Sequence, residues 1–203
     1  MKPAKLFPMF LKLAGRPCLV AGAGSIAESK IESLIEADGK VRVVAPKATS
    51  QIRYWAEKKR IEWIARDWEQ GDLDGMFLVI AATSSTEVHE RIFEEATRRG
   101  VLCNVVDVPG LCDFYYPAVV QRGALQIAIS TAGLSPALAQ RLRKELEHQF
   151  GAEYKAWLEE LGKERDKLFS VTLNPEERKR LLHDLVSAEA FQAFLRSRKK
   201  TKK

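Results

Sequence analysis

A glycine-rich run near the amino terminus has the residue types and spacing of a phosphate-binding turn. Gly22, Gly24 and Ala27 form the pattern G-x-G-x-x-A, which follows the apolar run Cys18–Ala21 and opens a helical pattern. Gly22 allows a tight turn, Gly24 lets the backbone approach a pyrophosphate, and Ala27 allows a helix to pack closely on a strand. The N–H groups at the helix N-terminus would bind the phosphates. The pattern predicts a dinucleotide site; the alternative is a glycine-rich turn that binds nothing.

The residues after the second apolar strand leave the choice of dinucleotide open. The run Val43-Val44-Ala45-Pro46-Lys47 has no Asp or Glu where a carboxylate usually binds the ribose of NAD. Lys47 would suit the 2′-phosphate of NADP, so the spacing does not separate NAD from NADP. Because this loop borders the site, we expect Pro46 and Lys47 to lie beside the adenosine.

One carboxylate stands where an acid could act on a substrate. Asp107 follows the apolar run 102–106, and ligands of parallel sheets bind at the carboxyl ends of the strands. A carboxylate there can accept a proton or stabilise a cationic centre while a hydride leaves. The alternative is that Asp107 caps a turn before Pro109, which is a common use of Asp. The spacing favours neither interpretation.

The elements that must position these residues alternate between strand and helix. Apolar runs at 18–21, 41–45, 61–64, 77–82 and 102–106 predict five strands. Helical spacing of apolar residues follows the first strand from Ile26 to Ile35, and a second helix is predicted over 86–99 with Gly100 as its C-cap. This alternation predicts an α/β fold with a parallel sheet that is covered on both faces.

The pattern changes after Asp107. Two short strands, 118–120 and 125–129, are joined by a turn, and Ser135-Pro136 opens a helix. Further helices are expected over 154–169 and from Asn174. We therefore divide the chain into a nucleotide-binding domain (1–113), a middle segment (114–150) and a helical region with a basic tail (151–203). The middle segment is too small to bury its own core, so we expect it to pack against a second copy in a homodimer.

Composition restricts the class of protein. The 203 residues carry a net charge of +6, but residues 196–203 hold six basic groups and no acid, which leaves the remainder neutral. We expect this tail to be a disordered, solvated end, and we predict neither a nucleic-acid nor a membrane partner. The apolar runs are too short to span a bilayer or form a secretory signal, which favours a cytoplasmic protein. The cysteines and histidines lack metal-ligand spacing, so we predict no metal site.

Four blocks in order along the chain resemble the precorrin-2 dehydrogenase family, which forms the dehydrogenase module, and often the ferrochelatase module, of siroheme synthase. They are Phe7–Leu13, Gly22–Lys30, Asn104–Asp107 and Tyr116–Ala139. The last block is the most diagnostic, because generic nucleotide-binding folds lack it. The resemblance runs from about residue 6 to residue 148, and the remainder is similar only as a helical extension.

The resemblance implies a Rossmann-type sheet followed by a small α+β dimerisation segment and a C-terminal helical region. It also implies the NAD-dependent conversion of precorrin-2 to sirohydrochlorin by a homodimer. By position, Ser25 and Ile26 would contact the pyrophosphate, Pro46 and Lys47 would lie at the adenosine, and Asp107 would be the key aspartate. Iron insertion by the same site stays open. The alternative from another class is an NAD-sensing regulatory module without catalysis.

The chain also departs from the family pattern. Ala23 replaces a glycine at the free position of the fingerprint, Ser29 a basic residue, Ser84-Ser85 an acidic pair, and His89 an asparagine. The last three departures touch the rim of the nucleotide site. Because the substrate would carry many carboxylates, basic residues of the middle segment are candidate contacts. They are Arg122, Arg141, Arg143 and Lys144. For Arg141, Arg143 and Lys144, a solvated charge on the helix face is the simpler explanation of each.

Overall fold

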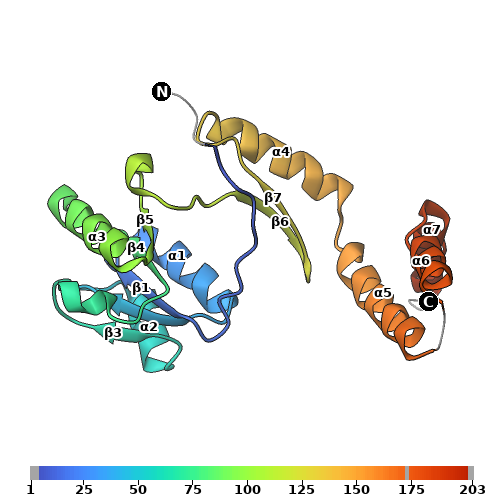
Figure 1. Cartoon of the computed structure of the whole chain (residues 1–203), viewed down its shortest axis with the longest axis horizontal. Helices are drawn as coiled ribbons and strands as arrows, with labels where there is room; N and C mark the ends of the chain where they lie inside the picture. Colours follow the sequence, from blue (N-terminus) through green and yellow to red (C-terminus); the bar gives the residue numbers. More distant parts are fainter. Residues whose placement is uncertain (1–4, 172–173, 201–203) are drawn as a thin grey trace. The chain divides into compact units, whose positions relative to one another are not determined.

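The computed structural model describes residues 5–171 and 174–200, which fall into two compact units on either side of the Tyr116–Pro117 bond. The first unit contains the glycine-rich run and Asp107. The second contains the short strands and the carboxyl-terminal helices (Figure 1). Within the described residues, no helix combines the length and the hydropathy that crossing a bilayer requires.

The first unit is built on a parallel sheet, as the alternation of apolar runs predicted. Its strands lie in the order β3-β2-β1-β4-β5, so the first strand is central (Figure 1). Every residue of β4 is buried, and so are the last four residues of β1, which explains why these runs are apolar throughout. The strands are β1 (Pro17–Ala21), β2 (Lys40–Val44), β3 (Glu62–Ile64), β4 (Leu78–Ala81) and β5 (Leu102–Val105).

Helices cover both faces of this sheet. α1 (Ser25–Glu36) and α2 (Ser50–Glu57) bury Ile31 and Ile52 against the face that carries Val20. α3 (Thr86–Arg99) buries Ile92 against the opposite face, beside Leu19. The alternation of Leu19 and Val20 between two cores follows from the two-residue period of a strand. Short 3₁₀ turns, η1 (Gln70–Leu73) and η2 (Pro109–Leu111), lie before β4 and after β5.

Local signals fix the ends of several helices, at Gly100, Ser135 and Asn174 as expected and at Ser85 in addition. The Ser85 hydroxyl accepts a hydrogen bond from Val88 N at the start of α3, and Gly100 adopts the left-handed conformation at its end, with φ of 69°. Ser135 and Asn174 cap α4 (Pro136–Gln149) and α6 (Pro175–Asp184) in the same way. Ser85 therefore has a structural use where the family carries an acid, because its side chain satisfies a free helical N–H group.

The second unit joins an antiparallel ribbon to four helices. β6 (Ala118–Arg122) pairs with β7 (Leu125–Ile129), and α4 packs on the ribbon. The Arg122 guanidinium donates to Phe150 O at 2.8 Å and Glu147 O at 3.2 Å, so it caps the carboxyl end of α4. α5 (Glu153–Ser170) and α7 (Ala188–Lys200) complete the unit with α6.

The end of the chain contradicts one expectation. The backbone of residues 196–200 belongs to α7, whereas the basic tail was expected to be disordered; residues 201–203 lie outside the described residues. The ring of Phe191 lies 4.9 Å from Tyr154 and 4.5 Å from Trp157, measured between centroids, and this contact holds α7 on α5. Once α7 is anchored, Arg and Lys extend it at little cost because both are good helix formers.

Glu95 predicts a pH dependence of stability in the first unit. It is buried on α3 and accepts hydrogen bonds from Arg98 and Arg99, which lower its pKa from 4.5 to about 2. Arg99 also pairs with Asp74, which links α3 to the turn before β4. Since the folded pKa lies below the unfolded one, this contribution is complete above about pH 4.5 and is lost as the pH falls toward about 2.

The measurement compares the thermal midpoint of Glu95→Gln with that of the wild type between about pH 7 and pH 2.5. We expect the variant to be less stable at neutral pH and the difference to shrink below about pH 4.5. Glu94→Gln is the matched control, because Glu94 is exposed and the described chain gives it no ion pair. A difference that stayed constant down to pH 2.5 would contradict this assignment of the charge.

Candidate dinucleotide site

The glycine-rich loop begins directly after β1, beside the first residue after β4. Gly22 has φ of +107°, and a Cβ atom built on it would lie 2.2 Å from the carbonyl oxygen of Ala82. Its N–H donates to Val44 O at 2.9 Å. Only glycine fits both this conformation and this approach, so the first glycine of the fingerprint is required by the fold itself.

The second glycine has a different environment. Gly24 is the N-cap of α1 in extended conformation, no side chain caps this helix end, and a Cβ at Gly24 would meet no atom within 4 Å. The next residues, Ser25 and Ile26, are exposed, with Ile26 keeping 53% of its surface. The first N–H groups of α1 are thus open to an anion, and the helix dipole favours one there. This geometry fits the pyrophosphate of a dinucleotide.

A second loop is fixed beside the first. Thr49 N donates to Ala23 O at 3.2 Å, and the Trp63 indole donates to Ala45 O at 3.0 Å. The first bond holds the β2–α2 loop against the glycine-rich loop, and the second ties it to β3; Pro46 and Lys47 are exposed on this loop. The structure therefore places both residues next to the fingerprint, at the edge where the adenosine half of a dinucleotide was expected.

Asp107 lies at the same carboxyl edge of the sheet, after β5. Its backbone is left-handed, with φ of +61°, in a turn in which Val108 N donates to Val105 O at 3.2 Å. The carboxylate is exposed and caps no N–H group of the described chain. Asp tolerates the left-handed region better than most residues, and this conformation is enriched at functional sites. The neighbouring Asp113 is instead structural, because its carboxylate accepts from Cys103 N at 2.8 Å.

The structure adds two residues that the sequence did not single out for the site. The Lys30 ammonium lies 3.8 Å from the centre of the Tyr116 ring and interacts electrostatically with Asp107. Burial lowers the pKa of Lys30, and the charge of Asp107 partly offsets that effect. The sequence signal that could have found Lys30 is its position on α1, five residues after Ser25. Tyr116 offered no such signal, because its approach to α1 depends on a fold-back of the chain.

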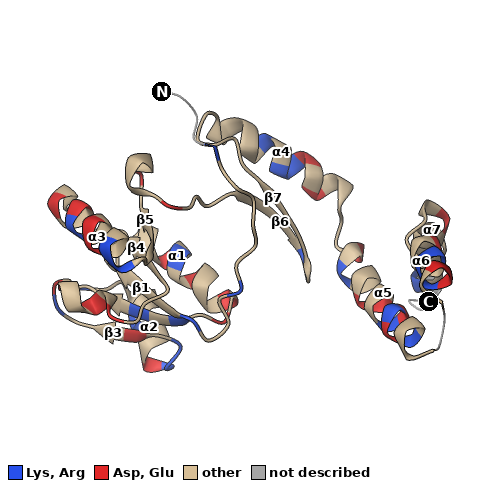
Figure 2. Ribbon diagram, in the orientation of Figure 1, with Lys and Arg blue, Asp and Glu red and all other residues tan. Residues whose placement is uncertain are grey.

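The basic residues of the second unit are mostly occupied within that unit. Arg122 caps α4, Arg141 pairs with Glu145 at 3.2 Å, and Arg143 pairs with Glu147 at 2.5 Å. Figure 2 shows the basic residues of α4 followed along the helix by its acidic residues. Lys144 is exposed, and the described residues give it no ion pair. The structure thus supports the interpretation of Arg141 and Arg143 as helix-face charges.

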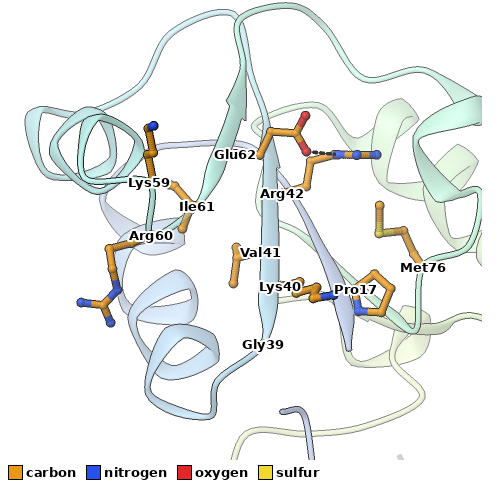
Figure 3. A pocket seen from close by; sticks show the side chains of 10 residues that line it. All are labelled: Pro17, Gly39, Lys40, Val41, Arg42, Lys59, Arg60, Ile61, Glu62 and Met76. Carbon is orange, nitrogen blue, oxygen red and sulfur yellow. Dashed lines mark hydrogen bonds and ion pairs between the residues drawn. The ribbon is translucent and has the colours of Figure 1, made fainter. Parts of the chain in front are cut away.

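A hollow of about 410 Å³ lies elsewhere, at the amino ends of β1, β2 and β3. It is lined by Lys40, Lys59 and Arg60 among others, but Figure 3 shows the side chains of Lys59 and Arg60 diverging. Arg42 is paired with Glu62 at 2.7 Å. Because ligands of such sheets bind at the carboxyl edge, and because these cations do not converge, we assign no role to this hollow.

Substitution of the two glycines should affect different properties, NAD affinity for Gly24 and stability for Gly22. Gly24→Asp should keep the wild-type thermal midpoint, because its side chain enters open space, yet raise the Kd for NAD about 100-fold or ~3 kcal/mol through steric exclusion and charge repulsion. Gly22→Ala should instead destabilise the fold by about 3 kcal/mol or more, through strain and overlap with Ala82. Calorimetric NAD titration beside thermal denaturation separates the two. Unchanged NAD affinity in folded Gly24→Asp would remove the pyrophosphate from this loop.

Comparison with known proteins agrees with this geometry. Residues 9–118 match a family described as putative NAD(P)-binding, and residues 122–149 match one described as sirohaem biosynthesis protein central. A siroheme synthase of Mannheimia succiniciproducens is 34% identical over 192 residues, 95% of this chain and 40% of that protein. A siroheme synthase of Nitrosococcus oceani is 38% identical over 159 residues, 73% of this chain and 34% of that protein.

A solved structure extends the likeness to the fold. The precorrin-2 dehydrogenase SirC superposes with a TM-score of 0.80 at 25% identity, over 96% of this chain and all of that one. The chain spans two fifths or less of the length of the two curated relatives. The expectation of a nicotinamide dinucleotide as cofactor is confirmed by the family match. The chain belongs to the putative NAD(P)-binding family, and its resemblance to the precorrin-2 dehydrogenase module of siroheme synthase is confirmed.

Proposed function

We propose that this chain oxidises precorrin-2 to sirohydrochlorin with NAD as the hydride acceptor. The observation that carries the proposal is the shared edge of the sheet: the open N-terminus of α1 follows β1, and the exposed carboxylate of Asp107 follows β5. A dinucleotide bound on α1 supplies the acceptor of the hydride. The similarity to siroheme synthases and to SirC supports a tetrapyrrole as the donor.

Asp107 is the residue that we assign to the chemistry. The reaction removes a hydride and a proton from the tetrapyrrole, so a base beside the reacting carbon accelerates it, typically by about 10² to 10⁴-fold. The Asp107 carboxylate makes no hydrogen bond to the described chain, which leaves its oxygens available to accept that proton. The same carboxylate would stabilise positive charge that develops on the ring as the hydride leaves.

Asp107→Asn should therefore lower turnover at least about 100-fold while leaving the Kd for NAD and the thermal midpoint unchanged. Asparagine tolerates the left-handed backbone as aspartate does, so the fold should persist. Asp38→Asn is the matched control, because Asp38 is also exposed and left-handed, with φ of 57°, but precedes β2 at the other end of the sheet. Near wild-type turnover in Asp107→Asn would reduce Asp107 to a turn residue.

The decisive assay is anaerobic incubation of the wild type with precorrin-2 and NAD, followed by the absorbance of sirohydrochlorin. A parallel reaction with NADP establishes which dinucleotide is used. Ferrous ion added after oxidation measures iron insertion by the same protein. NAD binding without any oxidation of precorrin-2 would favour the regulatory module and contradict the proposed enzyme.

We further propose that the protein works as a homodimer through residues of about 114–150, in the cytoplasm. Within the ribbon β6–β7, Val120 is the one buried residue, and a two-stranded ribbon is marginal by itself. Val119 and Leu138 stay exposed on β6 and α4, so apolar surface is available to a second copy. The free, buried thiols of Cys18 and Cys103 support a reducing compartment.

Val119→Arg should shift the protein from dimer to monomer in sedimentation velocity at micromolar concentration, because it places a charge on the ribbon face proposed to be covered. Gln192→Arg adds the same charge to an exposed position of α7, outside the proposed interface, and should leave the dimer intact. A wild-type protein that sedimented as a monomer would refute the proposal directly.

A further inference from the structure

Lys30 combines partial burial with unused hydrogen-bonding capacity. Its side chain is half-buried on α1, and its ammonium lies 3.8 Å from the centre of the Tyr116 ring. An ammonium has three N–H donors, and the described chain offers Lys30 neither a hydrogen-bond acceptor nor an ion pair within 4 Å. A partly desolvated cation that contacts an aromatic face and makes no hydrogen bond to the described chain is suited to bind an anion from outside the chain.

The ring beneath Lys30 is fixed by contacts far apart in the sequence. Asn104 Nδ2 donates to Phe114 O at 2.7 Å, and Cys103 N donates to the Asp113 carboxylate at 2.8 Å. These bonds tie the segment after η2 to β5, and the Phe114 and Tyr116 rings lie 6.0 Å apart.

Tyr116 stays uncharged beneath Lys30. Burial of its hydroxyl raises the pKa of Tyr116 to about 12. Tyr116 is therefore a neutral, fixed ring at physiological pH, and the position of the Lys30 ammonium is set before a ligand arrives.

The neighbourhood of Lys30 indicates which anion it takes. Ser25, where the pyrophosphate was placed, lies five residues earlier on α1, or about 7.5 Å along the helix axis. Asp107, by contrast, interacts electrostatically with Lys30. An anion on Lys30 thus lies near Asp107, on the side of the proposed reaction. There, the ammonium offsets the repulsion between the Asp107 carboxylate and a second negative group.

We propose that Lys30 binds a carboxylate of the tetrapyrrole beside Asp107 and thereby holds the ring carbon that loses its proton against the Asp107 carboxylate. This rests on the proposed function, which supplies a substrate with several carboxylates. Lys30 is a substrate-binding residue in this assignment, and Tyr116 is a positioning residue that acts through it.

The test uses Lys30→Met, which keeps the apolar stem over the Tyr116 ring and removes the charge. We expect the KM for precorrin-2 to rise about 10- to 100-fold, the Kd for sirohydrochlorin to rise in parallel, and the Kd for NAD to stay unchanged. Lys30→Arg should restore much of the affinity. Lys58→Met is the matched control, because the Lys58 ammonium also faces a tyrosine ring, 5.6 Å from the centre of Tyr54, but at the carboxyl end of α2. Tyr116→Leu should raise the KM with the charge of Lys30 intact.

Two results would overturn the inference. A Lys30→Met protein that folds and binds sirohydrochlorin like the wild type leaves Lys30 without this role. A loss of NAD affinity as large as the loss of sirohydrochlorin affinity assigns Lys30 to the dinucleotide phosphates instead. The proposed function fails separately: a wild type that binds sirohydrochlorin through Lys30 but does not oxidise precorrin-2 keeps the carboxylate-binding role of Lys30 and refutes the dehydrogenase.

Discussion

The first unit depends on one close approach, between Gly22 and the carbonyl group of Ala82. Any side chain at Gly22 would overlap that carbonyl, since even a Cβ would lie 2.2 Å from its oxygen. The contact allows the loop after β1 to turn tightly over the end of β4 and start α1 directly. The helix N-terminus, the β2–α2 loop bonded to Ala23, and Lys30 on the second turn of α1 all take their places from that turn. The site is therefore a consequence of backbone packing before any polar side chain contributes.

Much of this fold is readable in the sequence because its strongest signals are local. α3 spans 86–99 as predicted, since Val88, Ile92 and Ala96 repeat at helical spacing between a serine cap and a left-handed glycine. α2 was not predicted, because Ile52 is the one fully buried residue in its eight and gives no stripe. The disorder expected of the basic tail was wrong for residues 196–200, because Phe191 anchors α7 through contacts with α5 that are remote in sequence.

The site was predictable only as far as it is local. The glycine-rich pattern predicts Gly22 and Gly24, and the end of the fifth apolar run predicts Asp107, because a loop that follows a strand can be recognised from a short stretch of sequence. The pairing of Lys30 with Tyr116 is not visible in this way, because the chain between them, residues 31–115, must fold back onto α1. Arg122 shows the opposite error: its charge suggested a substrate contact, whereas its guanidinium is used by the carbonyl groups at the end of α4. The charge of a residue alone does not show whether that residue already makes a hydrogen bond or an ion pair within the fold.

Positive and negative groups lie at different places along the carboxyl edge of the sheet, and this arrangement suits the proposed reaction. The N-terminus of α1 and Lys30 present positive charge, while Asp107 after β5 presents a carboxylate that the described chain leaves unpaired. Phosphates and substrate carboxylates bind well to the first group, but a ring carbon that gives up a hydride becomes positive and needs the second. Holding the acid at a left-handed turn costs backbone energy. The turn sets the distance between the Lys30 ammonium and the Asp107 carboxylate. That distance decides which carbon of a bound polycarboxylate faces the base, which gives the strained turn a function.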